Sequence, residues 1–257
     1  MPDITGAVRA ERAGPVAVVT IAHPPVNAIS RQVAAGILEA LTTAEADAEC
    51  RALIVTGDGE RYFSAGADLT EFPPAAPAEE AASARLTRRL EASRLPVVAA
   101  VNGVAYGGGC EIALACDLRI CSDGARFAQP EIKLGIMPGC GGTQRLPRLV
   151  GRGPALEMLL TGDPIDSARA LEWGLVTRVT SLDRLAPDAL ALAELLAQRP
   201  PLAVGAIKRA LRRGLDGSLE AGLRREQDEF RRLLASEDAH EGVSAFLEKR
   251  SPTWRGR

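Results

Sequence analysis

The segment from 97 to 115 constrains the fold more than any other part of the sequence. It begins with Val97–Val101, five apolar residues of which three are β-branched, and this composition predicts a buried strand. Asn102-Gly103 predicts a turn, and three consecutive glycines at 107–109 precede a helix that we expect over 110–116. A glycine run before a helix lets bare backbone approach a ligand, and the first N–H groups of the helix favour negative charge. The segment therefore predicts a strand, a turn and a helix start that can hold an oxyanion.

Two glutamates lie beside glycine-rich turns. Glu111 falls in the first turn of the expected helix, and Glu131 precedes a second glycine-rich turn at 139–142. Each glutamate alone is consistent with a charge that stabilises a helix N-terminus. Together they suggest paired acid/base chemistry, because no other titratable group lies in such apolar surroundings. Two carboxyl groups brought close together would push their pKa values apart.

Composition and motifs exclude several classes of protein. The net charge is −2 and no basic tract of useful length occurs, which argues against a nucleic-acid partner. No G-x-G-x-x-G follows a predicted strand, and neither a P-loop nor a G-x-S-x-G motif occurs. With only two histidines and no Cys/His cluster, the sequence predicts neither a protein-held zinc site nor a nucleophilic triad.

The cysteines and the apolar segments indicate a reducing, aqueous compartment. Five cysteines without a C-x-x-C pair predict free, buried thiols in the cytoplasm. The polar N-terminus lacks the apolar core of a signal peptide. The most apolar window, 97–116, is long enough to span a membrane, but it contains Asn102, Glu111 and four glycines, so we expect it in the protein core.

Strands, helices and turns alternate in the first half of the chain. Strands are predicted near residues 16, 52 and 97, a spacing of about 40–45 residues that is typical of an α/β fold. A hairpin is expected across 13–15, and Ser30 is a candidate N-cap for a helix that reaches about Asp47. Residues 73–84, with three prolines, predict a loop.

The pattern changes after about residue 153. Helical periodicity dominates the rest of the sequence, and only 176–179 reads as extended. The helical segments expected there are 154–160, 167–173, 183–197, 202–213, 218–235 and 238–248. Such a helical tail is consistent with a lid, an oligomer contact or ordinary packing against the core.

Several separated motifs, in order, resemble the enoyl-CoA hydratase/isomerase (crotonase) family. The first signature runs from 52–57 through 63–69, and the second spans 96–117. The third comprises 129–131, 134–135 and 138–146, and further similar segments are 161–162, 170–176 and 246–252. The likeness covers about 16–180 and returns near the C-terminus, so it includes most of the chain.

The resemblance implies an α/β fold of crotonase type. Residues 1–195 would form a spiral of repeated ββα units, and 196–257 a C-terminal helical region used in trimer contacts, with trimers usually paired into hexamers. The substrate would be an acyl-CoA thioester, with no separate cofactor because coenzyme A is part of the substrate. No metal, nucleic acid or membrane partner is implied, and the expected location is the cytoplasm.

The resemblance also assigns roles to individual residues. The N–H groups of Ala67 and Gly108 would form the oxyanion hole for the thioester oxygen. Glu111 would hold and deprotonate a water molecule, and Glu131 would share that water and exchange the proton at C2. The residues implied in substrate binding or in positioning the water are Ala28, Ala65, Asp68, Leu69, Thr70 and Gly139.

The implied reaction is addition of water to a trans-2-enoyl-CoA, which gives a 3-hydroxyacyl-CoA. Isomerases of the family usually retain an acid/base that matches only Glu131, so the presence of Glu111 as well favours the hydratase. Another reaction of the family, such as double-bond isomerisation, remains an alternative, and so does an acyl-CoA binder without activity. The alanine- and proline-rich segment 73–82 lies where the family shapes its acyl pocket, so the preferred chain length stays open.

Overall fold

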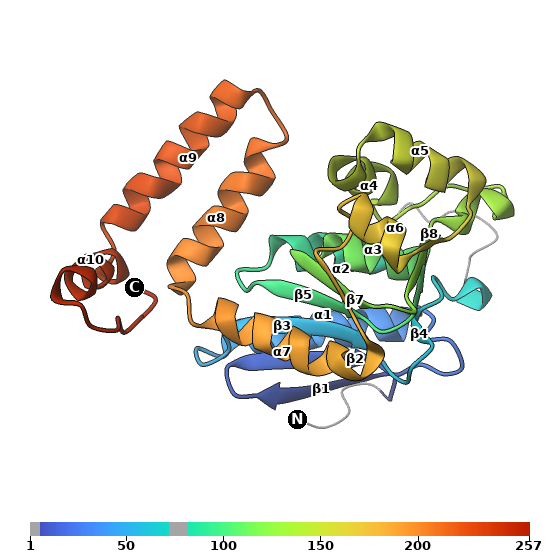
Figure 1. Cartoon of the computed structure of the whole chain (residues 1–257), viewed down its shortest axis with the longest axis horizontal. Coiled ribbons are helices and arrows are strands. Elements are labelled where there is room, and N and C mark those ends of the chain that lie inside the picture. Colours follow the sequence, from blue (N-terminus) through green and yellow to red (C-terminus); the bar gives the residue numbers. More distant parts are fainter. Residues whose placement is uncertain (1–5, 72–81) are drawn as a thin grey trace.

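The body of the molecule is a spiral of ββα turns built around two sheets (Figure 1). The structure, a computed structural model, describes residues 6–71 and 82–257. Most of the loop expected over 73–84 lies outside these residues. The elements of the four successive turns are β1 (Val8–Ala13), β2 (Val16–Ile21) and α1 (Arg31–Ala46); β3 (Ala52–Gly57), β4 (Tyr62–Ser64), η1 (Leu69–Glu71) and α2 (Ala82–Ala92); β5 (Val97–Val101), β6 (Val104–Tyr106) and α3 (Gly108–Ala115); and β7 (Leu118–Ser122), β8 (Arg126–Ala128), η2 (Pro130–Leu134) and α4 (Gly142–Val150).

The first strand of each turn joins a large sheet, and from the second turn onward the second strand joins a small one. The large sheet has the order β1-β2-β3-β5-β7-β10, with β10 at Arg178–Thr180. Its β1–β2 pair is the expected antiparallel hairpin, and its other pairs are parallel. The small sheet has the order β4-β6-β8-β9, with β9 at Ile165–Asp166.

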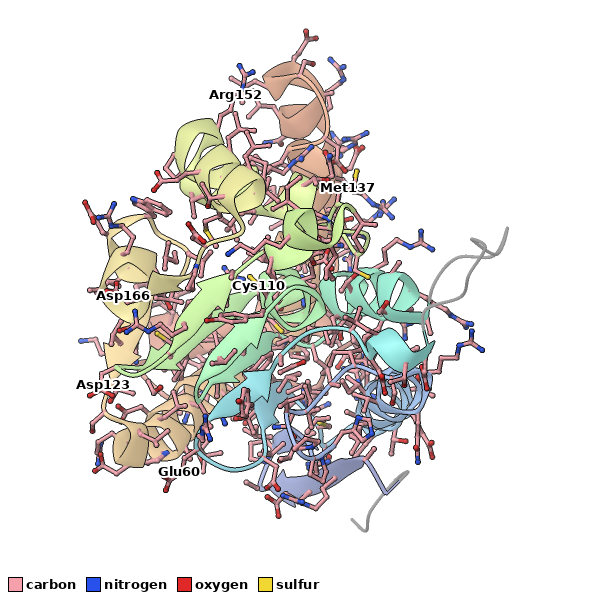
Figure 2. The ribbon with its side chains drawn as sticks, turned by 90° about the vertical axis from the view of Figure 1, so that its right-hand side faces the viewer. Glu60, Cys110, Asp123, Met137, Arg152 and Asp166 are labelled. Carbon is pink, nitrogen blue, oxygen red and sulfur yellow. The ribbon has the colours of Figure 1, made fainter. Side chains whose placement is uncertain are left out.

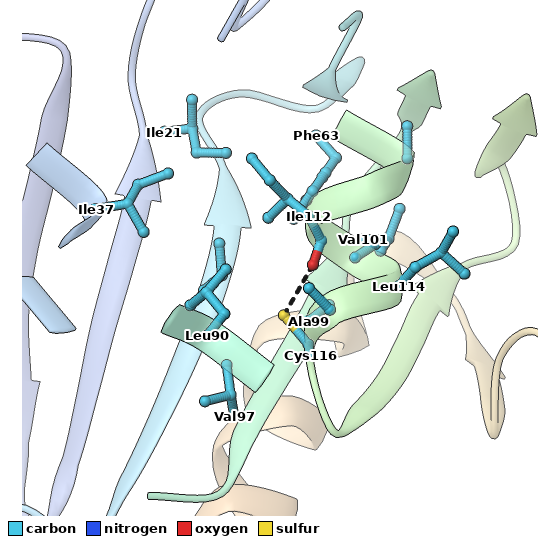
Figure 3. Close-up of a cluster of buried hydrophobic side chains, with 14 of the residues drawn as sticks. Ile21, Ile37, Phe63, Leu90, Val97, Ala99, Val101, Ile112, Leu114 and Cys116 are labelled. Atoms are coloured by element: carbon cyan, nitrogen blue, oxygen red, sulfur yellow. Dashed lines mark hydrogen bonds between the residues drawn. The ribbon is translucent and has the colours of Figure 1, made fainter. Parts of the chain in front are cut away.

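The central strands β3 and β5 of the large sheet are buried on both faces, which explains why their sequences are almost continuously apolar. Successive side chains of a strand point to opposite faces. Leu53 and Val55 of β3 therefore pack toward the core that α1, α2 and α3 share, whereas Ile54 packs toward Leu185 and Ala189 of α7 (Leu182–Ala197). Figure 3 shows the core on the first of these faces, where side chains of β5, α2 and α3 meet.

Asn102 fixes the corner at which the chain leaves one sheet for the other. Its side-chain oxygen accepts from the Gly57 N–H (3.1 Å), and its amide donates to the carbonyl oxygens of Gly59 (2.8 Å) and Tyr62 (3.1 Å). A Cβ atom on Gly103 would lie 2.2 Å from the Arg61 carbonyl oxygen, so only glycine fits the turn. The predicted Asn102-Gly103 turn is confirmed.

The most apolar window of the sequence forms β5, β6 and α3, and every residue of β5 and α3 is buried. The expectation that it belongs to the core is confirmed. Across 6–71 and 82–257, no single helix is long and apolar enough to cross a membrane. The pair α7 and α8 (Pro201–Gly214) passes that test of length and composition only when joined, and it is bent by 102°.

The last three helices extend away from the two sheets. α8 and α9 (Leu219–Leu234) lie side by side and project from the body, and α10 (Glu237–Glu248) follows at the end of the pair opposite the α8–α9 turn (Figure 1). Lys208 of α8 ties this region to the body, because its ammonium contacts the Asp117 carboxylate (2.5 Å) and donates to the Leu95 carbonyl oxygen (2.6 Å). The predicted boundary at 195/196 falls in the last turn of α7, and the division into two domains stays a prediction.

The short strands β4, β6 and β9 were not predicted. β4 and β6 each form three residues of the small sheet, and β9 forms two. Strands of this length are too short to show a period-two pattern in the sequence. The helix expected from 110 begins at Gly108, because the glycines themselves adopt helical backbone.

Replacing Asn102 with alanine is expected to destabilise the fold strongly. The substitution would leave the buried Gly57 N–H without its acceptor and remove two further hydrogen bonds. A loss of about 2–4 kcal/mol is expected, which lowers the melting temperature by roughly 5–10 °C. Ser122→Ala, which removes a single bond to the Asn102 carbonyl oxygen, is the control and should cost less than half as much. Equal melting temperatures for Asn102→Ala and the unchanged protein would contradict this account of the corner.

Candidate active site

The predicted catalytic groups follow the ends of three parallel strands that lie side by side in the small sheet. Ala67 follows β4, Gly108 and Glu111 follow β6, and Glu131 follows β8. Ligands of open α/β sheets commonly bind at the carboxyl ends of parallel strands. In Figure 2, Cys110 marks the first turn of α3 in the interior, and Met137 marks the segment between η2 and α4. The topology thus brings together residues that are far apart in the sequence.

The backbones of Ala67 and Gly108 lie next to each other. The Ile29 N–H donates to the Gly66 carbonyl oxygen (2.8 Å), and the Asp68 N–H donates to the Ile29 carbonyl oxygen (3.1 Å). These two bonds turn the Gly66 carbonyl group and the Asp68 N–H toward Ile29, so the Ala67 N–H between them points away from Ile29. A Cβ atom on Gly108 would lie 3.4 Å from the Ala67 nitrogen. Neither of these two N–H groups donates a hydrogen bond to another described residue.

Glycine is required where α3 begins. Gly107, the N-cap, has φ +49°, and a Cβ atom there would lie 2.9 Å from Glu131 Oε1. A Cβ atom on Gly109 would lie 2.5 Å from the Ser64 carbonyl oxygen. The glycine run therefore permits both the close approach of β4 and the placement of the Glu131 carboxylate over the helix start.

Glu111 is a buried carboxylate held by a glycine-rich loop. It is 2% exposed, and its Oε1 accepts from the N–H groups of Cys140 (2.7 Å) and Gly142 (2.8 Å). Burial raises the pKa of Glu111, while these N–H donors and the Arg145 charge oppose the rise. Since both bonds go to Oε1, Oε2 is left to accept from another donor.

Glu131 is half-buried in η2 and lies near the other carboxylate. Burial, together with the smaller effect of the Glu111 charge, raises its pKa to about 7. A carboxyl group with this pKa exists in both protonation states near neutral pH and is suited to donate and accept protons. The paired glutamates predicted from the sequence are therefore brought to one place.

Gln129 is a site residue that the sequence did not single out. It is 0% exposed, and its side-chain NH2 lies 3.2 Å from each carboxylate oxygen of Glu131, to which it donates. Its amide carbon lies 3.1 Å from where a Cβ atom on Gly142 would be, so it spans from Glu131 to the loop that binds Glu111. In the sequence, this role is indicated only by the position of Gln129, two residues before the candidate acid Glu131.

Five of the six other predicted residues lie along one edge of the site. The segment 65–70 runs beside 26–29, with the Ala65 N–H donating to the Val26 carbonyl oxygen (3.0 Å). Asp68 Oδ1 accepts from the Thr70 N–H (3.0 Å) and hydroxyl (2.7 Å), and Leu69 is 54% exposed. These five residues are Ala28, Ala65, Asp68, Leu69 and Thr70. The sixth, Gly139, lies in the loop that binds Glu111.

The cysteines of the chain are free, as predicted, and four of the five are buried. Cys140 is half-buried beside Glu111, and its thiol lies 3.1 Å from the Ser83 hydroxyl oxygen. Within the described ranges, no group of three or more His, Cys, Asp or Glu side chains is arranged to hold a metal ion.

Comparison with known proteins gives concordant matches over nearly the whole chain. The sequence profile described as enoyl-CoA hydratase/isomerase matches residues 11–257. A 2,3-dehydroadipyl-CoA hydratase from Escherichia coli K12 is 44% identical over 90% of this chain and 91% of its own length. A short-chain-enoyl-CoA hydratase from Clostridium acetobutylicum is 42% identical over 93% and 94%. The crystal structure of an enoyl-CoA hydratase from Bacillus anthracis has a TM-score of 0.92 at 35% identity and covers 98% of this chain and 100% of that one.

These matches agree with the fold and the motifs. The spiral of ββα turns predicted from the resemblance is confirmed by the likeness to the solved hydratase structure. The three motifs lie at the ends of β4, β6 and β8, where the two candidate carboxylates and the paired N–H groups gather. The chain belongs to the enoyl-CoA hydratase/isomerase family.

Proposed function

We propose that this enzyme is a hydro-lyase that adds water across the double bond of a trans-2-enoyl-CoA to give a 3-hydroxyacyl-CoA. The observation that carries the proposal is the meeting of Glu111 and Glu131 beside two N–H groups that have no acceptor among the described residues. The names of relatives at 42–44% identity, both hydratases of CoA thioesters, support the same reaction.

The N–H groups of Ala67 and Gly108 bind the thioester oxygen. Addition of water at C3 moves negative charge onto this oxygen and forms an enolate, which the two donors and the N-terminus of α3 stabilise. The donors are preorganised by the bonds of Ile29 to the neighbouring residues, so little reorganisation is needed during the reaction. In other enzymes, loss of one such donor lowers the rate by about 10²–10³.

The two glutamates divide the proton transfers. Glu111 accepts a proton from water as the oxygen attacks C3, and its two N–H donors favour the ionised form against the effect of burial. Glu131, with a pKa of about 7, is partly protonated at neutral pH and delivers a proton to C2. The hydroxyl group of the water thus ends on C3, and its other proton goes to Glu111. C2 receives the proton that Glu131 carried. A proton transfer from Glu111 to Glu131 then returns both carboxyl groups to their starting states.

The remaining predicted residues serve to place the substrate. The exposed segment 65–70 and Ala28 provide a backbone edge for the CoA portion, and Gly139 lies where its N–H can help to hold the water beside Glu111. Coenzyme A enters and leaves as part of the substrate, so the proposed reaction uses no separate cofactor.

Two alternatives are disfavoured by the same geometry. Double-bond isomerisation needs one acid/base to move a proton, whereas here two carboxylates serve one site. A binder without activity gains nothing from a carboxylate that is 2% exposed, because burying it disfavours the ionised form. Product analysis with 2-enoyl and 3-enoyl thioesters separates these possibilities.

We also propose that the enzyme is a cytoplasmic homotrimer or a dimer of trimers, with neither a nucleic-acid nor a membrane partner. The projecting helices carry large exposed apolar side chains, among them Ile207, Leu211, Leu219, Phe246 and Leu247. Exposed apolar clusters of this kind are typical of association surfaces.

Sedimentation at micromolar concentration is expected to give three or six times the 27.1 kDa mass of the chain. Leu211→Glu and Phe246→Glu together should shift the distribution toward smaller species, because each places a charge on a surface that association would bury. A monomer at micromolar concentration of the unchanged protein would contradict the proposed assembly.

Glu111→Gln and Glu131→Gln are each expected to lower kcat by about 10²–10⁴, because each removes one of the two proton-transfer groups. The measurement is the loss of enoyl-thioester absorbance with thioesters from crotonyl-CoA to long acyl chains, with identification of the products. Glu157→Gln, on the exposed face of α5 (Arg152–Thr161), is the control and should leave kcat unchanged. If the unchanged enzyme were no faster than Glu131→Gln on every thioester, the proposed function would be wrong.

Glu131 is also expected to make stability depend on pH. Its pKa is about 7 in the folded protein against 4.5 for an ordinary glutamate, so the folded state binds more protons between these values. Stability therefore falls as pH rises from about 4.5 to 7, by at most about 3 kcal/mol. Glu131→Gln should melt several degrees higher than the unchanged protein at pH 8 and equally at pH 4.5. A difference that is the same at both pH values would refute this.

A further inference from the structure

We infer that Arg145 is a positioning residue for Glu111: it anchors the loop 139–142 whose N–H groups hold that carboxylate. This inference rests on the proposed function, in which Glu111 is the base that activates water. Arg145 touches neither of the two glutamates by hydrogen bond, and it acts through the backbone of Cys140.

The loop presents two donors with an anchored carbonyl group between them. The N–H groups of Cys140 and Gly142 both donate to Glu111 Oε1, at 2.7 and 2.8 Å. The Cys140 carbonyl oxygen, which lies between them along the chain, accepts from Arg145 Nη1 (2.8 Å) and from the Thr87 hydroxyl (2.9 Å). The Cys140 carbonyl group belongs to the planar peptide unit between residues 140 and 141, and the two donors lie in the peptide units on either side of it. With the middle unit fixed, each donor can turn only about the backbone bonds that join its own unit to it. The aim of both donors at Glu111 therefore depends on the two anchors.

All three nitrogens of the Arg145 guanidinium group donate hydrogen bonds, two to Glu91 and one to the Cys140 carbonyl oxygen. Its Nε and Nη2 donate to the two oxygens of Glu91, at 3.1 and 3.0 Å, which is the bidentate geometry that arginine alone provides. The third nitrogen, Nη1, is thereby directed at the Cys140 carbonyl oxygen. A Cβ atom on Gly141 would lie 2.0 Å from Nη1, so the loop approaches the guanidinium as closely as a glycine allows.

The residues that hold Arg145 and the Cys140 carbonyl group in place, Glu91 and Thr87, both belong to α2. Glu91 and Thr87 are four residues apart and so lie on one face of that helix. The Cys140 carbonyl oxygen is reached directly by Thr87 and indirectly by Glu91 through Arg145. α2 is consequently linked by hydrogen bonds to the carboxylate of Glu111.

Arg145 also contributes a positive charge to the surroundings of Glu111. The titratable groups that face this carboxylate are Glu131 on η2, Arg145 on α4 and the thiols of Cys110 and Cys140. Arg145 is the cation among them, and its charge lowers the pKa of Glu111 against the effect of burial. Its removal should raise that pKa and leave less of the base ionised at a given pH.

The test compares Arg145→Met with Arg145→Lys, using kcat, KM and the pH profile of hydration. Arg145→Met should lower kcat by about 10- to 100-fold with KM changed less than about threefold, since the donors to the base lose their aim. The acidic limb of its pH profile should move up by about 0.5–1 unit. Arg145→Lys keeps the charge but not the fork, so it should lose kcat with little movement of the limb.

Arg148→Met is the matched control, because Arg148 is an exposed arginine of the same helix whose hydrogen bonds within the described part of the chain go to Gln144. It should leave kcat and the pH profile unchanged. If Arg145→Met melted lower but kept both kcat and the acidic limb, Arg145 would only join α2 to α4, and the inference would be overturned. If Arg145→Met fails to fold, Arg145→Lys decides: unchanged kcat overturns the inference. An unchanged enzyme without hydratase activity would instead overturn the proposed function.

Discussion

The parallel pairing of β4, β6 and β8 is the constraint on which the site depends. Parallel strands point their carboxyl ends to the same edge, and here each end leads into a segment with one part of the chemistry. β4 leads to Ala67, β6 to Gly108 and Glu111, and β8 to Glu131. The ββα repeat produces this arrangement, because the second, third and fourth turns each send their second strand into the small sheet while their first strand stays in the large one.

The close approach of the segments after β4 and β6 converts that arrangement into a pair of donors. A Cβ atom on Gly108 would lie 3.4 Å from the Ala67 nitrogen, and Ile29 holds the first segment from its other side. Glycine is needed at the two neighbouring positions, because a Cβ atom would lie 2.9 Å from Glu131 Oε1 at Gly107 and 2.5 Å from the Ser64 carbonyl oxygen at Gly109. A backbone donor pair has little freedom to move, so it is preorganised for an oxygen that gains charge during a reaction.

The sequence contained most of this site in its motifs. The glycine run with Glu111 and the Pro130-Glu131 pair were recognised because catalytic groups stood beside turns in an apolar context. Arg145 was not, since the ion pair that orients it joins it to Glu91, 54 positions away. Gln129 was not, since its role depends on the direction of its side chain. The strands β4 and β6 were missed for a related reason: three residues form a strand only because a neighbouring strand is present.

A buried carboxylate makes its supporting loop as important as the carboxylate itself. Burial disfavours the ionised form of Glu111, so the proposed role of Glu111 as a base depends on the two N–H groups that the loop directs at its carboxylate. A loop that includes Gly141 at φ +107° has little conformational preference of its own. Its shape must therefore be imposed from outside, and the contacts that impose it come from Arg145 and Thr87. Through them, the protonation of a base on α3 becomes a property of how α2 and α4 are packed.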